Sequence, residues 1–166
     1  MAEDVSAYYW STALGDPELA PTYRMLEGCT DTGGGYRMLV PKDWCAISPV
    51  PRVGPAGFAV HGVVWQSPGN PRSGRLVVLG LPPDAGFFAA EILETLAGLD
   101  GLEVEEELPH PNTTLGKASS DDRVAYFAVT RTDEGWLALI AEAARDQADA
   151  EPHLRASTAT FQARAE

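Results

Sequence analysis

The feature that most constrains this chain is an unbroken apolar run near its middle. Residues 75–81 read Arg-Leu-Val-Val-Leu-Gly-Leu, and residues 76–79 within them have no polar side chain. A short apolar run bounded by turn residues is typical of a buried strand, and a strand without a polar face must be covered on both sides. The run therefore predicts an interior strand of a sheet with helices packed over it.

Four further segments have the composition of strands. In residues 36–40, Tyr36, Met38 and Val40 alternate with Arg37 and Leu39, and a turn follows. Residues 58–65 are rich in β-branched and aromatic side chains. Residues 124–129 and 136–141 are also strand-like, and the polar segment between them contains Asp-Glu-Gly. We interpret the last pair as a hairpin.

One helix is predicted directly after the central run. Asp84 can cap it, and Gly101 can end it. Its apolar residues recur at spacings of four, four and three: Phe88, Ile92, Leu96 and Leu99. We expect the face formed by the first three to pack on the sheet.

A second helix is predicted near the C-terminal end. Asp149 and Pro152 are typical of a helix start, and Leu154, Thr158 and Phe161 then fall on one face. The strands are joined mainly by turns, with only two clear helices. This pattern favours an α+β fold, a central mostly antiparallel sheet of five to seven strands flanked by helices, over a doubly wound parallel sheet.

The length of 166 residues suits one domain. We place that domain at residues 35–166. Residues 1–34 contain the aromatic cluster Tyr8, Tyr9 and Trp10, two prolines and a glycine run, a mixture that predicts an irregular N-terminal arm.

Two segments carry a resemblance to a known family. Residues 35–44, Gly-Tyr-Arg-Met-Leu-Val-Pro-Lys-Asp-Trp, resemble the opening strand of the PsbP/Mog1/DcrB-like family, where an aromatic-led strand runs into a Pro-x-x-Trp turn. The aromatic-led strand 136–140, followed by a helix that ends with Ser157 to Phe161, is similar to the end of that family. The resemblance spans residues 35–162 in element order. It implies a Mog1/PsbP-like sandwich and a non-enzymatic accessory or adaptor protein.

The branches of that family differ in role, and the resemblance leaves a secretion-associated role open for this chain. One branch assists photosystem II, another binds a small nuclear GTPase, and bacterial branches are lipoproteins or secretion-associated proteins. This chain lacks a lipoprotein signal with its cysteine, and its first residues, Met-Ala-Glu-Asp, are acidic where a secretory signal is basic. No run approaches the roughly 18 apolar residues of a membrane span. We expect a soluble, cytoplasmic bacterial protein.

The sequence offers no recognisable catalytic or metal-binding motif. The three histidines, His61, His110 and His153, are far apart and have no metal-ligand spacing. We expect His153, in the first turn of a helix, to be solvated. The glycine run 33–35 precedes a strand, unlike a phosphate-binding loop, and no nucleophile elbow occurs. We therefore expect no catalytic residue, metal or cofactor.

An alternative to the adaptor remains open. A site can be built from scattered residues, so a small enzyme or a small-ligand-binding domain is the rival class. A deep pocket with convergent polar groups around His61 or His110 would favour it.

Acidic residues concentrate in one segment. Residues 84–122 hold ten acidic residues and a single basic one, Lys117, in a chain with 24 acidic and 12 basic residues and a net charge of -12. This charge repels nucleic-acid phosphates and anionic membranes, so we expect neither as a partner. It can steer a basic protein to the chain, although a charge run can also serve solubility alone.

The partner-binding residues predicted from this pattern lie in a short charged strand. Strand alternation puts Glu105 and Glu107 on one face and Glu106 on the other, and an acidic strand is typical of a sheet edge. We expect Glu103, Glu105 and Glu107 to bind a protein partner with a basic surface. The aromatic residues Tyr8, Tyr9 and Trp10 are the second candidate anchor.

Two further pairs leave alternatives open. Cys29 and Cys45 are the only cysteines, and they can form a disulfide or remain two free thiols. Arg72 and Arg75 in the long loop before the central run can hold an anion or simply be solvated.

Overall fold

A computed structural model describes residues 23–30, 34–47, 52–53, 59–67, 70, 72–108 and 113–163. The central sheet contains β3 (Cys45–Ile47), β4 (Arg52–Val53), β5 (Ala59–Trp65), β6 (Arg75–Leu81), β7 (Glu103–Leu108), β8 (Thr113–Ser119), β9 (Arg123–Arg131) and β10 (Trp136–Ala144). Seven of these follow the order β3-β5-β6-β10-β9-β8-β7, and β4 pairs with β5 beside this path. Every pairing between the described strands is antiparallel.

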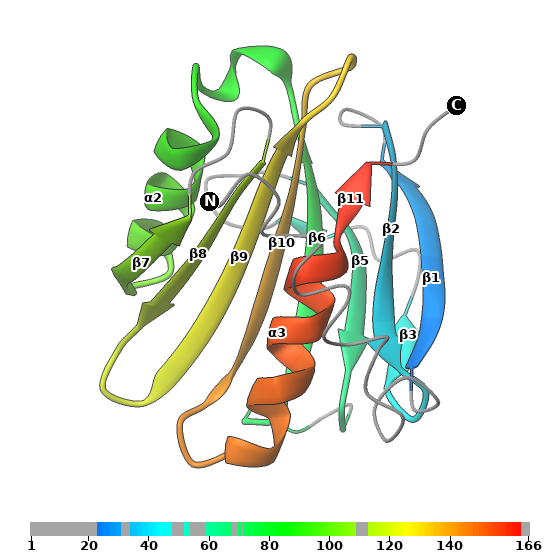
Figure 1. The fold of residues 1–166 in the computed structure, drawn as a ribbon, viewed down its shortest axis with the longest axis vertical. Coiled ribbons are helices and arrows are strands. Elements are labelled where there is room, and N and C mark those ends of the chain that lie inside the picture. Colours follow the sequence, from blue (N-terminus) through cyan, green and yellow to red (C-terminus); the bar gives the residue numbers. More distant parts are fainter. Residues whose placement is uncertain are drawn as a thin grey trace.

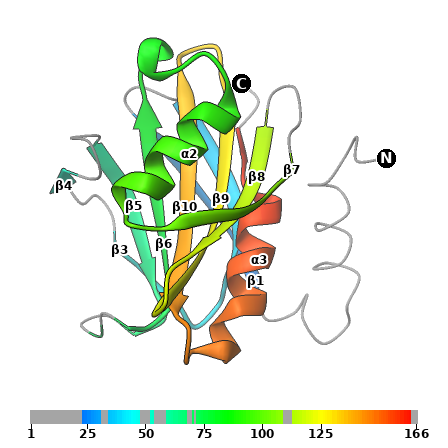
Figure 2. The ribbon, with the colours of Figure 1, turned by 90° about the vertical axis from the view of Figure 1, so that its left-hand side faces the viewer.

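A second, smaller sheet lies against the central one. Its order is β1-β2-β11, with β1 (Tyr23–Thr30), β2 (Gly34–Pro41) and β11 (Gln162–Ala163). The helices are α2 (Ala89–Leu99) and α3 (Glu151–Thr160), preceded by the 3-10 turns η3 (Pro83–Ala85) and η4 (Ala148–Ala150). Figure 2 shows α2 across one face of the central sheet, and Figure 1 shows α3 beside the small sheet. The predicted α+β class with a central antiparallel sheet and flanking helices is confirmed.

The central apolar run forms the interior strand that the sequence predicts. β6 lies between β5 and β10, and its side chains are buried on both faces. Val77 and Leu79 belong to the core under α2, whereas Leu76 and Val78 belong to the core under α3 and the small sheet. Successive strand residues point to opposite faces, so one apolar strand contributes to both cores.

The N-terminal boundary of the domain differs from the prediction. Residues 23–30 form strand β1 and pair with β2 along its whole length, so the prediction of an irregular arm over 1–34 is wrong for this segment. The connection to β2 ends at Gly34, whose φ of 85° favours glycine. The rest of the predicted arm, including Tyr8, Tyr9 and Trp10, lies outside the described residues.

The predicted packing face of the first helix is only partly correct. Ile92 and Leu96 are buried against the sheet, but Phe88 is 72% exposed. Asp84 lies in η3 and does not cap α2; Phe88 occupies the position before the first helical residue, and its backbone is extended. A side chain at that position lies off the helical stripe, so helical spacing does not bury it. Gly101, with a φ of 73°, follows the helix as predicted.

The second helix, α3, is bonded directly to the small sheet. Ser157 Oγ donates to the Leu39 carbonyl at 2.7 Å, and the Leu39 N–H donates to Thr160 Oγ1 at 3.0 Å. At the other end of α3, His153 Nδ1 is hydrogen-bonded to the Tyr23 hydroxyl at 2.9 Å. The prediction that His153 is solvated is therefore wrong. Its ring packs edge-on against Tyr23 and Trp44, and burial lowers its pKa.

Candidate partner-binding surface

The acidic strand β7 is an edge of the central sheet, as the sequence predicts. It pairs with β8 on one side and with no other described strand. Glu103, Glu105 and Glu106 are exposed along it. Figure 2 shows β7 beside α2. An open strand edge presents unpaired N–H and C=O groups to a partner strand.

A bulge in β7 changes the faces of its glutamates. Val104 lies opposite Ala118 and Glu106 opposite Lys117, so Glu105 is the extra residue between these two pairs. Val104 packs on the core under α2, and Glu106 lines a hollow beside α3. The strict alternation assumed from the sequence is therefore interrupted at Glu105. A bulge also twists an edge strand locally.

Glu107 is less accessible than the sequence predicts. It faces α2, where Glu94 lies close, and it is only partly exposed. Burial and the neighbouring Glu94 carboxyl raise the pKa of Glu107. Glu106, which the sequence analysis set apart, is exposed in its place. The accessible acidic set on β7 is therefore Glu103, Glu105 and Glu106.

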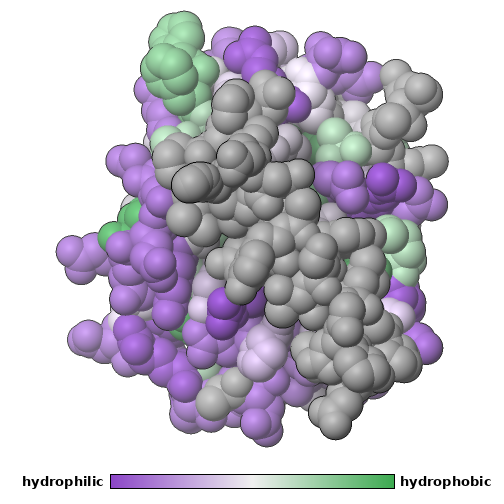
Figure 3. Space-filling model, viewed as in Figure 1, coloured by the Kyte–Doolittle hydropathy of each residue, from purple (hydrophilic) through white to green (hydrophobic). Residues whose placement is uncertain are grey.

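An aromatic pair that the sequence analysis missed lies in the turn before α2. Phe87 is 82% exposed and Phe88 is 72% exposed. Figure 3 shows a hydrophobic cluster over this end of the molecule, among mostly hydrophilic surroundings. Two consecutive phenylalanines cannot both fit one helical stripe. The presence of two consecutive phenylalanines is therefore the only feature of the sequence that indicates that one of them faces outward.

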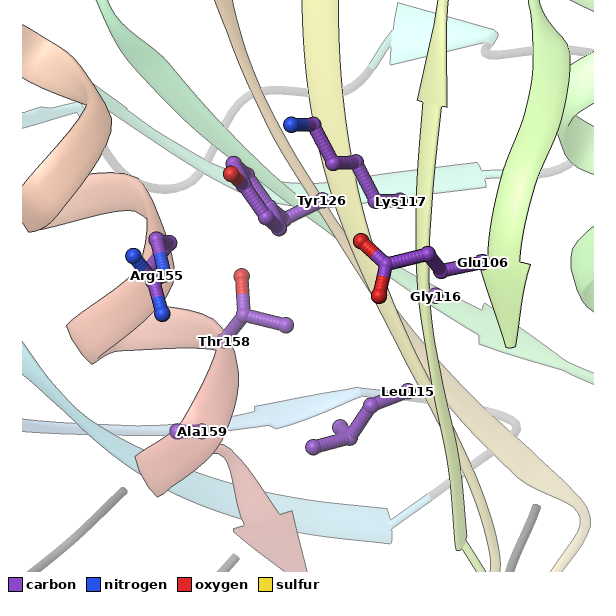
Figure 4. A pocket seen from close by; sticks show the side chains of 8 residues that line it. All are labelled: Glu106, Leu115, Gly116, Lys117, Tyr126, Arg155, Thr158 and Ala159. Atoms are coloured by element: carbon purple, nitrogen blue, oxygen red, sulfur yellow. The ribbon is translucent and has the colours of Figure 1, made fainter. Parts of the chain in front are cut away.

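A hollow lies between α3 and the strands β7, β8 and β9 (Figure 4). It contains about 380 Å³, its open mouth included, and its lining residues are Glu106, Leu115, Gly116, Lys117, Tyr126, Arg155, Thr158 and Ala159. The Tyr126 hydroxyl donates to Glu151 Oε1 at 2.6 Å, and Lys117 Nζ lies 3.7 Å from the same oxygen. Burial and the bond to Glu151 raise the pKa of Tyr126, so this phenol stays protonated.

Three of the polar side chains that line this hollow, Lys117, Tyr126 and Thr158, are engaged with neighbours within the protein. The Thr158 hydroxyl donates to the Leu154 carbonyl within α3, at 2.7 Å. His61, around which an enzyme site was considered, lies on β5, which β6 and β10 separate from β9. His110, the other such residue, is outside the described part of the chain. None of the described residues that line the hollow is a histidine.

The described residues contain no group of three or more His, Cys, Asp or Glu side chains placed to hold a metal ion. Within the same residues, no helix is long and apolar enough to cross a membrane. Cys29 and Cys45 are both exposed free thiols, which decides the pairing that the sequence left open.

The arginines considered as an anion site are bound to carboxylates of the protein. Arg72 forms an ion pair with Asp146, and Arg75 forms one with Glu142 at 2.9 Å. Each carboxylate takes the place that an external anion would occupy. These two arginines therefore do not converge on a common site.

Thirteen solved chains match the architecture of this chain, and they include the following two. The solution structure of cyanobacterial PsbP (CyanoP) from Synechocystis sp. PCC 6803 is 13% identical, has a TM-score of 0.52, and the match covers 84% of this chain and 92% of that one. The fold is of the PsbP/Mog1/DcrB type. The crystal structure of LpqN, involved in cell envelope biogenesis of Mycobacterium tuberculosis, shares this PsbP-like fold at 15% identity and a TM-score of 0.50, covering 84% of this chain and 91% of that one. No protein-family model and no curated protein matches the sequence.

Proposed function

We propose that this chain is a non-enzymatic accessory protein that binds another protein through strand β7. The observation that carries the proposal is the edge of β7, which pairs with no described strand except β8, together with its exposed glutamates, Glu103, Glu105 and Glu106. A partner strand can add to this edge by backbone hydrogen bonds, while basic side chains on it pair with the glutamates.

The adaptor is favoured over the rival class of a small enzyme or ligand-binding domain. The hollow beside α3 holds a tyrosine and a lysine that both contact Glu151, and a threonine bonded within its own helix. Groups already engaged in this way are poor candidates for proton transfer to a substrate. LpqN, one of the structural relatives, is described as involved in cell envelope biogenesis, which is in keeping with an accessory or envelope-related role here. A cytoplasmic location remains a prediction.

Photo-crosslinking in the source organism tests the proposal. A photoreactive amino acid replaces Glu105 at the open edge, and a control chain carries it at Asp43, exposed in the turn between β2 and β3. We expect position 105 to crosslink one protein with a basic surface, identified by mass spectrometry, and position 43 not to. Equal crosslinking at both positions, or none at position 105, would contradict the proposal.

A further inference from the structure

The two exposed phenylalanines before α2 have no structural role in the described core. Neither Phe87 nor Phe88 belongs to a buried cluster, whereas the neighbouring Ala89 and Ile92 do. Exposed aromatic pairs are uncommon on monomeric surfaces, because water is a poor solvent for phenyl rings. Aromatic side chains of this kind are favoured anchors at protein interfaces.

The turn that carries these rings is held in one shape by the protein. The Phe87 N–H donates to Glu91 Oε1 at 2.8 Å, and the Phe88 carbonyl accepts the first helical bond from the Ile92 N–H at 3.3 Å. A side chain at Gly86 would collide with Glu91 and Ile92, each only 2.8 Å from the position of its Cβ. On the far side, Trp136 Nε1 donates to the Pro83 carbonyl at 3.4 Å. A turn fixed from both sides loses little conformational entropy when the rings bind.

The surroundings of the pair are acidic. The exposed face of α2 carries Glu91 and Glu94, and Glu94 lies beside Glu107 of the acidic strand β7. α2 has 11 residues and is thus about 16 Å long. Its far end exposes a further apolar side chain, Leu99, at 52%. The phenyl pair therefore stands at one end of an acidic surface that continues to β7.

We propose that Phe87 and Phe88 are the aromatic anchor of the partner interface, and that they bind a segment of a partner protein with apolar side chains flanked by lysine or arginine. The proposal rests on the proposed function, because the same partner contacts β7. Charge complementarity selects this occupant: the rings need apolar contact, and the glutamates beside them need positive charge. A second copy of the chain brings the same negative charge, and an anionic membrane does too, so both are repelled.

A phage-displayed library of random linear peptides, selected on the wild-type protein, tests this inference. Dissociation constants of the selected peptides are then measured by fluorescence anisotropy on wild type, F87S/F88S, E103Q/E105Q/E106Q and the control M25S. Met25 is also an exposed apolar side chain, at 42%, but on the small sheet. We expect peptides that combine aromatic or aliphatic residues with lysine or arginine. Binding should weaken by about tenfold or more in F87S/F88S and remain unchanged in M25S.

The outcomes separate this inference from the proposed function. If peptide binding is weakened by E103Q/E105Q/E106Q but not by F87S/F88S, the aromatic anchor is overturned, whereas the acidic edge of β7 remains supported. If peptide binding is weakened only by F87S/F88S, the result supports the aromatic anchor and contradicts the proposed role of β7. A selection without basic enrichment, or without peptides above background, overturns the inference.

Two parallel measurements test the two alternative partners, a second copy of the chain and an anionic membrane. Sedimentation of wild type against F87S/F88S reports self-association, and flotation with vesicles containing phosphatidylglycerol reports membrane binding. Self-association or flotation that depends on the two phenylalanines would overturn the choice of a basic protein partner. Unchanged thermal unfolding of F87S/F88S confirms that the variant keeps its fold.

Discussion

At the scale of single residues, Glu142 is the most connected buried charge of the described chain. It lies on β10, with its side chain only 6% exposed. Its two oxygens accept hydrogen bonds from Arg75 of β6 at 2.9 Å and Arg123 of β9 at 2.7 Å. Arg123 also binds Asp100 at the end of α2. One carboxylate thus links three strands to a helix.

Replacing Glu142 should destabilise the fold far more than breaking an exposed ion pair. Glu142→Gln leaves Arg75 without its carboxylate partner and Arg123 with Asp100 alone. We expect a loss of about 2–3 kcal/mol, below the full cost of a broken buried pair because both arginines are about one-third exposed. The control, Asp146→Asn, breaks the exposed pair with Arg72 and should cost about 0–1 kcal/mol. Urea unfolding measures both. Similar losses for the two variants would contradict the structural role of Glu142.

Arg75 shows what a single sequence cannot reveal about a site. The loop sequence around Arg72 and Arg75 is equally consistent with a site for an external anion and with ion pairs to carboxylates of the protein. An arginine pair has the same chemistry in both cases. The deciding carboxylate, Glu142, follows Arg75 by 67 residues. Only the pairing of β6 with β10 brings them together, and that pairing is not visible in local spacing.

At the scale of elements, local signals predict the strands and helices that bury continuous apolar surface. The run at β6, the hairpin β9–β10 and helix α3 follow from patterns within ten residues. Strand β8 does not, because its sequence, TTLGKAS, is small and partly polar and is extended through its pairing with β7 and β9. The acidic edge at β7 could be predicted from charge. The bulge at Glu105 and the exposure of Phe88 could not, because both depend on backbone geometry.

The attachment of α3 to the small sheet should depend on pH through His153. Burial lowers the pKa of His153 in the folded chain, while Asp43 and Asp149 oppose this shift. The unfolded chain therefore takes up the proton more readily, so this contribution to stability is complete above the ordinary histidine pKa of about 6.5 and is lost as the pH falls below it.

The expected result is a smaller pH dependence when the imidazole is removed. Urea unfolding at about pH 7.5 and about pH 5.5 should show a larger stability loss for wild type than for His153→Gln. Wild type and variant share all other titratable groups, so the contributions of these groups to the pH dependence cancel in this comparison. They include Asp100, whose pKa is raised by burial. An equal loss in the two chains would show that His153 keeps its ordinary pKa.

The glutamates of β7 should act on association rate more than on complex lifetime. For E103Q/E105Q/E106Q and the crosslinked partner, we expect association at low salt to slow by about tenfold, with a weaker salt dependence and a nearly unchanged dissociation rate. Stopped-flow fluorescence measures both rates. The control D43N/D146N/D149N loses three exposed charges outside this surface. Equal rates for both variants would mean that the acidic run only aids solubility, and Tyr8, Tyr9 and Trp10 would become the next candidates.

At the scale of the whole molecule, charge is distributed unevenly. Residues 84–122 hold ten of the 24 acidic residues but one of the 12 basic ones, so the remaining chain has 14 against 11 and is nearly balanced. In the fold this segment forms α2, β7 and β8, which lie together at one side of the central sheet. Such an asymmetric field orients a charged partner before contact.

The same asymmetry should cost stability. Like charges held together repel, and at low ionic strength this repulsion extends over about 30 Å. Neutralising part of the surface in E103Q/E105Q/E106Q should therefore raise the free energy of unfolding slightly, by no more than a few tenths of a kcal/mol per charge, and raise the thermal unfolding midpoint with it. At about 0.3 M NaCl the repulsion is screened, and the difference from wild type should vanish. Scanning calorimetry at both salt concentrations measures the effect. A variant less stable than wild type at low salt would show that these glutamates stabilise the fold, and an acidic surface kept for binding would then lose its energetic argument.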